Sequence, residues 1–334
     1  MIPAVSAGAY TAARERAAFV ERGDRGGIVV SGADRASYLQ GLLTNDIAAL
    51  APGTGCYAAY LTAQGRMIAD MYVYELGDVI LLTLDRAVKD AVIAKLDQFI
   101  FSEDVQLGDV TDTFAHIAVV GPEAPRVAAA ALGGVDAGAL AALPEHGNLR
   151  VASTHGAAIV ARVADAGEPG FDLSVERAQA AGVKSALASA GVPEMDEATS
   201  EALRIEAGVP KFHRDMNEET IPLEAGIEER AISFTKGCYV GQEIVIRVLH
   251  RGHGRVARKL VGMALTGAQP PPSGARIRSG DREIGEVTSS TMSPALQRPI
   301  ALGYVHRDFV EPGTTVDVEG LPGEVVKLPF FVSS

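Results

Sequence analysis

The fold can be read outward from Gly27-Ile28-Val29-Val30-Ser31-Gly32-Ala33-Asp34-Arg35, where a short apolar run meets a glycine and then polar residues. A helical pattern follows, and its apolar face holds Tyr38, Leu39, Leu42 and Leu43. The same order returns later in the chain, where residues 117–120 are apolar and an alanine-rich helical pattern comes next. In each copy a glycine separates the apolar run from the helical pattern, and Gly121 lies 89 positions after Gly32. A strand followed by a helix is thus predicted twice.

A second pair of segments supports a repeat. Residues 81–87 and 171–178 share a strand pattern that ends in arginine and alanine, and Arg177 lies 91 positions after Arg86. Two matches at nearly the same offset predict a duplicated unit of strand, helix, strands and helix. Within the first copy, alternating patterns separated by glycine turns predict strands over residues 57–61, 67–75 and 79–84. Each copy is therefore expected to be a ferredoxin-like α+β part.

Short strand patterns divided by glycine and proline fill the C-terminal part of the chain. They cover residues 256–265, 275–277, 283–289, 300–305, 315–318 and 323–327. Strands of this length with tight turns predict a small antiparallel β-barrel. The expected fold class is therefore α+β, with a first module at residues 1–110, a second at 111–247 and the barrel at 248–334.

The composition limits the class of protein. The 334 residues hold two cysteines that are far apart in sequence, which excludes a disulfide framework and a four-cysteine iron-sulfur cluster. The first eight residues lack a basic and apolar leader, and the apolar segments are too short to span a bilayer. The net charge of −12 argues against a surface that coats nucleic acid. We expect a cytoplasmic monomer without membrane contact.

One of the two cysteines lies in the motif Lys236-Gly237-Cys238-Tyr239-Val240-Gly241-Gln242-Glu243. A neighbouring ammonium such as that of Lys236 lowers the pKa of a thiol, and the thiolate is the form that acts as nucleophile or metal ligand. The glycines permit close approach of a ligand to the backbone, and the tyrosine offers a stacking face. Cys238 is thus a candidate catalytic residue. The competing interpretation is an inert, buried cysteine in a glycine-bounded turn.

The stretch after the motif is basic. Residues 244–280 contain no Asp or Glu, and their arginines include Arg247, Arg251 and Arg255. The functional interpretation of such a zone is contact with a polyanionic ligand or RNA, and the alternative is that it balances acids elsewhere in the fold. His250 and His253 lie in the same zone but lack a suitable third ligand nearby. No permanent metal is therefore expected.

A helix is predicted to start after Asp196 and to end near Ala207, before a glycine and a proline. Glu206 lies in its last turn. A carboxylate is mildly unfavourable there, because the C-terminal end of a helix carries partial negative charge. Glu206 therefore needs a donor, which is either solvent or a specific ligand.

These features resemble the YgfZ family of folate-binding proteins, which take part in iron-sulfur protein maturation and are similar to the T-protein (aminomethyltransferase) of the glycine cleavage system. The motif of residues 236–243 looks like the signature of that family. Further similar segments lie at residues 38–46, 65–74, 203–208, 221–226, 285–289 and 300–305. The resemblance covers the chain from about Gly26 onward, and it implies a cloverleaf of three modules around a central folate pocket.

The resemblance also implies roles for single residues. Glu206 matches the T-protein glutamate that receives the pterin ring, so that its carboxylate would accept two parallel N–H bonds. Asp70 falls where T-proteins place an aspartate near the reactive folate nitrogens; they usually carry two adjacent acids, and this chain has Ala69 before Asp70. Lys236 and Tyr239 are expected beside bound tetrahydrofolate, and a polyglutamate tail is a candidate ligand of the basic zone.

Three hypotheses of function follow. The leading one is a folate-binding protein that supports iron-sulfur cluster assembly or repair, and through it tRNA modification, without classical turnover. Cys238 would be a redox-active thiol or transient cluster ligand, and the partners would be iron-sulfur proteins, their assembly machinery, and tRNA or tRNA-modifying enzymes. The first alternative is a tetrahydrofolate-dependent aminomethyltransferase or demethylase that uses Asp70. The second alternative is a non-enzymatic RNA- or protein-binding module.

Overall fold

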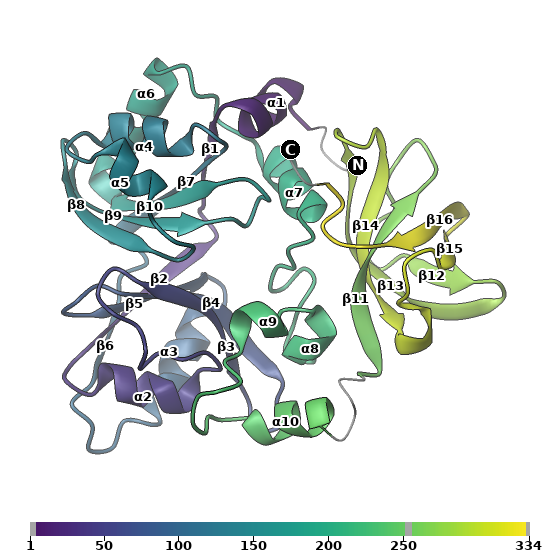
Figure 1. The fold of residues 1–334 in the computed structure, drawn as a ribbon, viewed down its shortest axis with the longest axis horizontal. Coiled ribbons are helices and arrows are strands. Elements are labelled where there is room, and N and C mark those ends of the chain that lie inside the picture. The colour runs from purple at the N-terminus through teal and green to yellow at the C-terminus, as the bar shows by residue number, and fades with distance from the viewer. Residues whose placement is uncertain (1–4, 251–255, 332–334) are drawn as a thin grey trace.

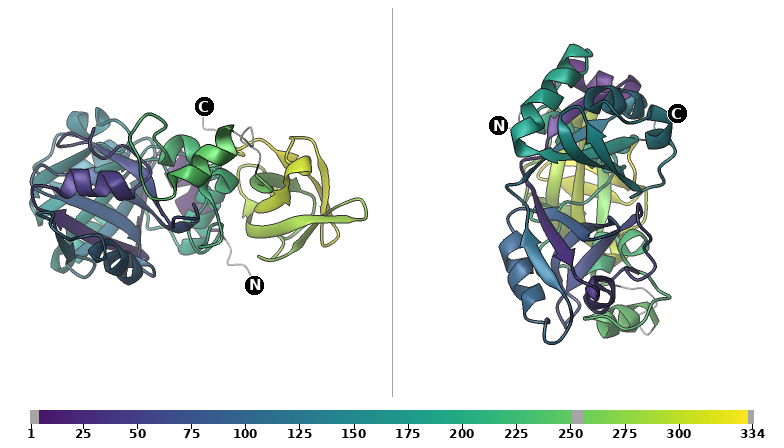
Figure 2. Two further views of the ribbon diagram at one scale, coloured as in Figure 1. Left: turned by 90° about the horizontal axis from the view of Figure 1, so that it is seen from below. Right: turned by 90° about the vertical axis from the view of Figure 1, so that its left-hand side faces the viewer.

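The computed structural model describes residues 5–250 and 256–331 of the chain. Within these residues it contains two five-stranded antiparallel sheets and a closed barrel of six strands. Figure 1 shows the two sheet modules stacked on one side and the barrel on the other, with helices between them. Views from two other sides place the barrel beside the stack (Figure 2). The expected α+β cloverleaf with a C-terminal barrel is confirmed.

The first module contains the first copy of the predicted repeat. Its elements are β2 (Arg25–Ser31), α2 (Arg35–Leu42), β3 (Gly55–Leu61), β4 (Met67–Glu75), β5 (Ile80–Asp85), α3 (Lys89–Asp97) and β6 (Gln106–Asp109). The strands lie side by side in the order β3-β4-β5-β2-β6. Because side chains alternate between the two faces of a strand, one face of the sheet is apolar and packs on the helices. Val73, Leu82 and Leu96 are wholly buried in that core.

The second module repeats this arrangement. Its elements are β7 (Phe114–Val120), α4 (Ala124–Leu132), α5 (Ala137–Ala141), β8 (Asn148–Ser153), β9 (Gly156–Val163), β10 (Gly170–Glu176), a 3-10 turn (Arg177–Gln179) and α6 (Ala180–Ser189). The sheet order is β8-β9-β10-β7-β1, so its first four strands stand where β3, β4, β5 and β2 stand in the first module. The repeat predicted from the two sequence offsets is confirmed.

The fifth strand of the second sheet comes from the N-terminal segment. Strand β1 (Ala18–Glu21) pairs antiparallel with β7, from Ala18 opposite Val120 to Glu21 opposite Ile117. Phe19 is buried in the core of the second module. The structure therefore differs here from the expected boundary, which assigned residues 1–110 to the first module. Four residues are too few to show an alternating pattern, and nothing in so short a segment indicates its pairing partner.

Each module has a glycine directly after its first repeat strand, and the structure shows why both copies need glycine there. Gly32 has a φ of 103°, and a Cβ there would lie 1.9 Å from the carbonyl oxygen of Asp104. Gly121 has a φ of 125°, and its Cβ would lie 2.6 Å from the carbonyl oxygen of Arg16. Both positions thus require a residue without a side chain, because both the backbone angle and the space exclude one.

The helices outside the two modules join the three parts. They are α1 (Ala7–Glu15), α7 (Glu197–Glu206), α8 (Pro222–Ala225), α9 (Glu228–Ala231) and α10 (Gln242–His250). Asp196 caps α7 as predicted, because its side chain accepts a hydrogen bond from the backbone N–H of Thr199 at 2.7 Å. Helix α10 occupies part of the stretch that the sequence marked only as basic.

The C-terminal part is the predicted antiparallel barrel. Its elements are β11 (Arg258–Leu265), β12 (Arg276–Ser279), β13 (Arg282–Ser293), β14 (Arg298–His306), a 3-10 turn (Arg307–Phe309), β15 (Thr315–Val318) and β16 (Leu321–Val326). The strands close in the order β11-β14-β13-β12-β15-β16. Across the described ranges, no helix combines the length and the apolar character that crossing a membrane requires.

Candidate active site

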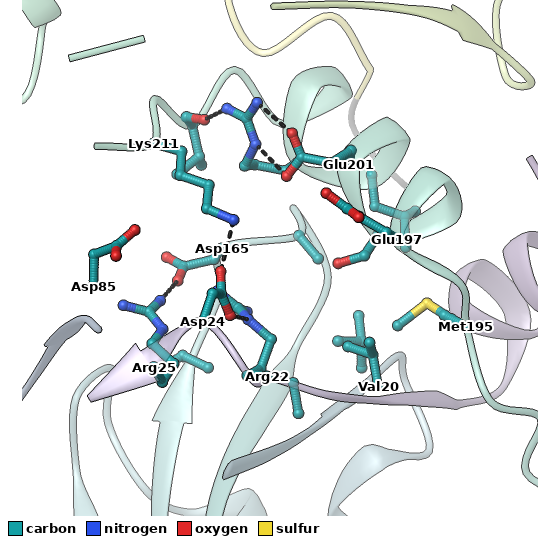
Figure 3. Close-up of a pocket in the computed structure, with 18 of the residues that line it drawn as sticks. Val20, Arg22, Asp24, Arg25, Asp85, Asp165, Met195, Glu197, Glu201 and Lys211 are labelled. Atoms are coloured by element: carbon teal, nitrogen blue, oxygen red, sulfur yellow. Dashed lines mark hydrogen bonds and ion pairs between the residues drawn. The ribbon is translucent and has the colours of Figure 1, made fainter. Parts of the chain in front are cut away.

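A cavity of about 530 Å³ lies where the two sheet modules meet α7. Its size falls in the range of pockets that enclose small organic ligands. Figure 3 shows Arg22, Asp24 and Arg25 on one side of the cavity, with Glu197 and Glu201 of α7 across from them. The wall is therefore rich in charges of both signs, and most of these charged side chains are held by ion pairs or hydrogen bonds with each other.

Asp70 lies on the cavity wall in β4, beside Tyr57 of the neighbouring strand β3. The Tyr57 hydroxyl donates a hydrogen bond of 2.6 Å to Oδ2 of Asp70. Burial raises the pKa of Asp70, and it outweighs the lowering effects of Tyr57 and Arg25. A carboxyl group of this kind exchanges a proton closer to neutral pH than an ordinary aspartate does. Ala69 is wholly buried, because it points to the opposite face of the strand.

Asp165, from the turn between β9 and β10, is the centre of a charged cluster in the cavity. Arg25 and Arg230 approach its oxygens at 3.4 and 3.5 Å, and the hydroxyl of Tyr72 donates a hydrogen bond to it. Burial is the largest single effect and would raise the pKa of Asp165. Arg25 and Arg230, together with the Tyr72 hydrogen bond and Arg22, outweigh it and lower the pKa. Asp165 is therefore held as a carboxylate.

The same two arginines also hold the tyrosines of the cavity in place. The guanidinium of Arg25 lies 5.3 Å from the ring centre of Tyr72, and that of Arg230 lies 5.1 Å from the ring centre of Tyr57. Such contacts between a cation and an aromatic face are attractive at these distances. The position of Tyr57, and through it that of Asp70, thus depends on Arg230 of α9.

Asp24 links the loop after β1 to the segment that follows α7. Its Oδ2 accepts a hydrogen bond of 2.6 Å from the ammonium of Lys211, and Arg22 lies 3.6 Å from its Oδ1 (Figure 3). Burial acts to raise the pKa of Asp24, but Arg22 and Lys211 lower it well below its usual range. The ion pairs of Asp24 thus join this wall of the cavity to the end of α7.

Arg204 of α7 connects the cavity to the barrel. Its Nε and one terminal nitrogen bond to the carboxylate of Glu201 at 3.0 and 2.8 Å. Its other bonds go to Asp215 at 2.7 Å, to the carbonyl of Val209 at 2.6 Å and to Ser289 of β13 at 3.0 Å. All five N–H donors of a guanidinium are thereby used. Glu201 faces the cavity, where Arg204 lowers its pKa against the effect of burial.

Glu206, which the sequence assigned to pterin binding, lies outside the residues that line the cavity. It is wholly buried, and its oxygens accept hydrogen bonds from Tyr10 at 2.6 Å and from Arg14 and Ser293. The donors that its helix position requires are therefore protein groups from α1 and the barrel. This geometry gives Glu206 a role where α1 and α7 meet the barrel, and it offers no support for contact with folate.

Lys236 does not point to the thiol that it was expected to activate. Its ammonium donates hydrogen bonds to the carbonyls of Gln40, Leu43 and Asn45 at 2.7, 2.7 and 2.8 Å. An ammonium has three N–H donors, and all three are used here. Lys236 thus secures the end of α2, where a positive charge also suits the helix dipole.

The rest of the motif packs on the outside of the first module. None of the motif residues is among the described residues that line the cavity. Cys238 is exposed, Tyr239 is buried in the core of the first module, and Gly241 lies against Thr62 in the turn before β4. The predicted contacts of this motif with folate have no support in the geometry. The other cysteine, Cys56, is half-buried, and burial raises the pKa of its thiol to about 12, against an opposing effect of Lys236.

The candidate anion or RNA contacts are only partly within the structure. Arg247 lies on α10 and is half-exposed. Its guanidinium is 3.7 Å from the carboxylate of Glu243, a motif residue in the first turn of the same helix. Arg251 and Arg255 lie outside the described residues, as does His253. Among the residues that the structure does describe, no group of three or more His, Cys, Asp and Glu is arranged to hold a metal ion.

Arg25, Arg230 and Asp165 were not predicted as functional residues. Arg25 and Asp165 are 140 positions apart in the chain, and Arg230 is another 65 positions beyond Asp165. No local motif joins them, since Arg25 begins β2, Arg230 lies in α9 and Asp165 lies in the turn between β9 and β10. The sequence shows only that charged residues lie near the ends of predicted strands and helices. Because this is true at many other places, it could not have identified these three residues.

Comparison with known protein families gives two matches that together cover most of the chain. The GCVT N-terminal domain matches residues 3–236, and the glycine cleavage T-protein C-terminal barrel domain matches residues 258–331. Residues 237–257, which include Cys238 and α10, lie between the two matches.

Curated relatives align over nearly the whole chain. An aminomethyltransferase of Rubrobacter xylanophilus is 34% identical over 327 residues, which cover 96% of this chain and 85% of the relative. An aminomethyltransferase of Streptomyces coelicolor is 33% identical over 333 residues, which cover 96% of this chain and 88% of the relative. The crystal structure of glycine cleavage system aminomethyltransferase T from Bartonella henselae superposes with a TM-score of 0.87 at 23% identity, over 98% of this chain and 89% of that one. This last similarity shows the shared fold.

Proposed function

The chain belongs to the glycine cleavage T-protein family, and from this membership we propose that it is a tetrahydrofolate-dependent aminomethyltransferase. Aminomethyltransferases of this family use tetrahydrofolate. Two relatives that carry this name match 96% of the chain at 33–34% identity, which supports transfer of the activity more strongly than a match to one domain would. The observation that carries the proposal in the structure is the position of Asp70 in the cavity.

This proposal replaces the leading hypothesis from the sequence. The expectation of an iron-sulfur assembly or repair factor that supports tRNA modification is wrong, because the full-length relatives are aminomethyltransferases. The geometry agrees, since Cys238 is exposed outside the cavity and Lys236 is bound to backbone carbonyls. Iron-sulfur proteins and tRNA are accordingly withdrawn as partners, and tetrahydrofolate is retained as the ligand.

The cavity has the size and the polar groups that a folate requires. A volume of about 530 Å³ is in the range of pockets that enclose ligands of this size. Carboxylates accept the paired N–H groups of an aminopyrimidine edge, and Glu197 and Glu201 line the cavity from one face of α7. Arg204 already donates to both oxygens of Glu201 and Arg214 to one oxygen of Glu197, so a ligand would use the remaining lone pairs of these carboxylates. We assign to these two residues the role that the sequence gave to Glu206. Bound tetrahydrofolate supplies the nitrogen that receives the one-carbon unit.

Asp70 is the residue to which we assign proton transfer at the cavity wall. Its raised pKa suits exchange of a proton with an amine at a higher pH than an ordinary aspartate allows, and Tyr57 fixes its orientation. A second acid at position 69, as T-proteins usually have, would not face the same side of β4 as Asp70. Asp70 thus performs this role alone in the present chain.

The test is turnover of the full chain with tetrahydrofolate and an aminomethyl donor, followed by chromatography of the folates and assay of released ammonia. We expect methylenetetrahydrofolate from the wild type and a loss of about 100-fold or more in kcat for Asp70→Asn, because general acid–base groups typically contribute that much. Asp112→Asn, an exposed acid paired with Arg86, is the matched control and should retain activity. Absence of turnover by the wild type together with absence of tetrahydrofolate binding would disprove the proposal.

A further inference from the structure

The two sheets face each other with polar side chains between them. In the described part of the chain, five polar atoms of this inter-sheet layer are buried without a hydrogen-bond partner: Arg25 Nε, Tyr74 Oη, Thr83 Oγ1, His116 Nε2 and Asp172 Oδ1. Buried polar groups in folded proteins are nearly always hydrogen-bonded, so a group of five needs an explanation.

The five residues form one cluster and are not scattered. Thr83 pairs with Tyr72 across β4 and β5, and Tyr74 is two residues further along on the same face. On the second sheet, His116 pairs with Ser174, and Asp172 is two residues away on the same face. Their side chains are buried, with Tyr74, Thr83, His116 and Asp172 all below 7% exposure.

The two faces are in contact with each other. Ile159 and Ala161 of β9, in the second sheet, belong to the apolar cluster of the first module. The charge of Asp172 interacts electrostatically with His116 on its own sheet and with Arg25 and Tyr74 on the other. Asp172 is therefore a common neighbour of three of the unpartnered groups, His116, Arg25 and Tyr74.

The cluster contains four groups that can donate a hydrogen bond and one carboxylate that can only accept. Burial lowers the pKa of His116 to about 4, so the ring is neutral, and the Ser174 hydroxyl lies 3.0 Å from its Nδ1. If that hydroxyl donates to Nδ1, then Nε2 carries the ring proton. His116, Tyr74, Thr83 and Arg25 each then offer an N–H or O–H, whereas the Asp172 carboxylate only accepts. Yet no hydrogen bond joins any of them to Asp172 within the described residues.

A nucleophilic site is the first alternative, because Ser174, His116 and Asp172 have the composition of a hydrolase triad. Their geometry does not fit that role. Asp172 forms no direct hydrogen bond to the second ring nitrogen in the structure as described, and all three side chains are buried between the sheets. A substrate would have no access to the serine.

We propose that ordered water molecules bind within this polar layer between the two sheets and bridge the Asp172 carboxylate to Tyr74, Thr83, His116 and Arg25. A water molecule accepts two hydrogen bonds and donates two, so it can take bonds from two of these donors and pass two to the carboxylate. Polar groups that are neighbours without being within bonding distance are the usual setting for such a bridge.

The site is continuous with the cavity through Arg25. A terminal nitrogen of this residue pairs with Asp165 on the cavity wall, while its Nε belongs to the unpartnered cluster. The water molecules therefore fix the position of Arg25, and with it that of Tyr72 and Asp165. This inference concerns the inter-sheet layer and does not depend on the activity proposed above.

The test combines crystallography of the full chain with magnetic relaxation dispersion of water nuclei, which counts long-lived internal water. We expect ordered water within hydrogen-bonding distance of Asp172 and of at least two of the four donors. The double variant Tyr74→Phe, Thr83→Val should hold fewer long-lived water molecules than the wild type. The matched control Thr111→Val should not, because the Thr111 hydroxyl already bonds to the backbone N–H of Gly27 at 3.1 Å. A dry space, direct bonds among the five groups, or a bound molecule other than water would each overturn the inference.

Discussion

The hydrogen bond from Tyr57 to Asp70 controls how readily the cavity carboxylate releases its proton. Because this bond stabilises the charged form, Tyr57→Phe should raise the pKa of Asp70 further. We expect the acid limb of the pH–rate profile to move to higher pH, with a smaller change in KM for tetrahydrofolate than in kcat. The matched control is Tyr60→Phe, since Tyr60 lies on the same strand and, among the described residues, outside the cavity wall. Superimposable profiles for the wild type and Tyr57→Phe would contradict the assignment.

Lys236 provides a second prediction for a single residue, this one on stability. Lys236→Met keeps much of the side-chain volume but removes three hydrogen bonds to the carbonyls at the end of α2. We expect the free energy of unfolding to fall by about 2–3 kcal/mol, because bonds from charged groups are stronger than neutral ones and the carbonyls lose their partner. Lys259→Met is the control, since Lys259 is half-exposed and has its one described ion pair at 3.7 Å. Urea unfolding of both variants measures the difference, and an equal effect would show that Lys236 has no special structural role.

At the scale of elements, the repeat strand of each module is followed by a glycine where a positive φ and a close backbone contact both disfavour a side chain. Gly32→Ala would place a Cβ 1.9 Å from the Asp104 carbonyl, in addition to the cost of a positive φ. Gly191→Ala separates these two costs, because Gly191 has a φ of 76° with no described atom within 4 Å of the added carbon. We expect Gly191→Ala to lose about 1 kcal/mol of unfolding free energy and Gly32→Ala to lose clearly more. Similar losses in thermal or urea unfolding would show that the contact with Asp104 relaxes at little cost.

Elements defined by local patterns could be predicted from the sequence, whereas long-range pairings could not. The strands of the repeat and of the barrel were predicted because alternation and glycine turns are local properties, as the capping of α7 by Asp196 is. Strand β1 was missed because its partner β7 is remote and its four residues carry no pattern. The helix position of Glu206 predicted that it needs a donor, and the family resemblance gave it the pterin as ligand. The donors that satisfy it in the structure come from α1 and β13, which no local rule connects to α7.

At the scale of the whole molecule, ion pairs between the modules should make stability depend on pH. Asp24, Asp165 and Glu201 have pKa values below their usual range, so their contribution is present above about pH 4 and is lost as the pH falls. Asp70, whose pKa is raised, acts in the opposite direction. We expect a net fall in the free energy of unfolding between about pH 5 and pH 2.

The variant Asp165→Asn isolates one of these contributions. It should be less stable than the wild type at pH 7, because Arg25 and Arg230 lose their shared carboxylate, and the two proteins should converge at low pH. Asp112→Asn, whose carboxylate is largely exposed, should follow the wild type throughout. Urea unfolding at a series of pH values gives the curves, and parallel curves for Asp165→Asn and the wild type would contradict the assignment.

The pairing of β1 with β7 has a consequence for synthesis of the chain on the ribosome. Residues 18–21 emerge early, but their partner strand, residues 114–120, is made only after the whole first module has appeared. At a synthesis rate of about 5–20 residues per second, β1 waits roughly 5–20 s without its partner. The first module can fold during this delay, whereas the second sheet closes only when the late strands return to the start of the chain. A nascent chain released before residue 120 would therefore expose an unpaired strand, and unpaired strands are the segments from which aggregation begins.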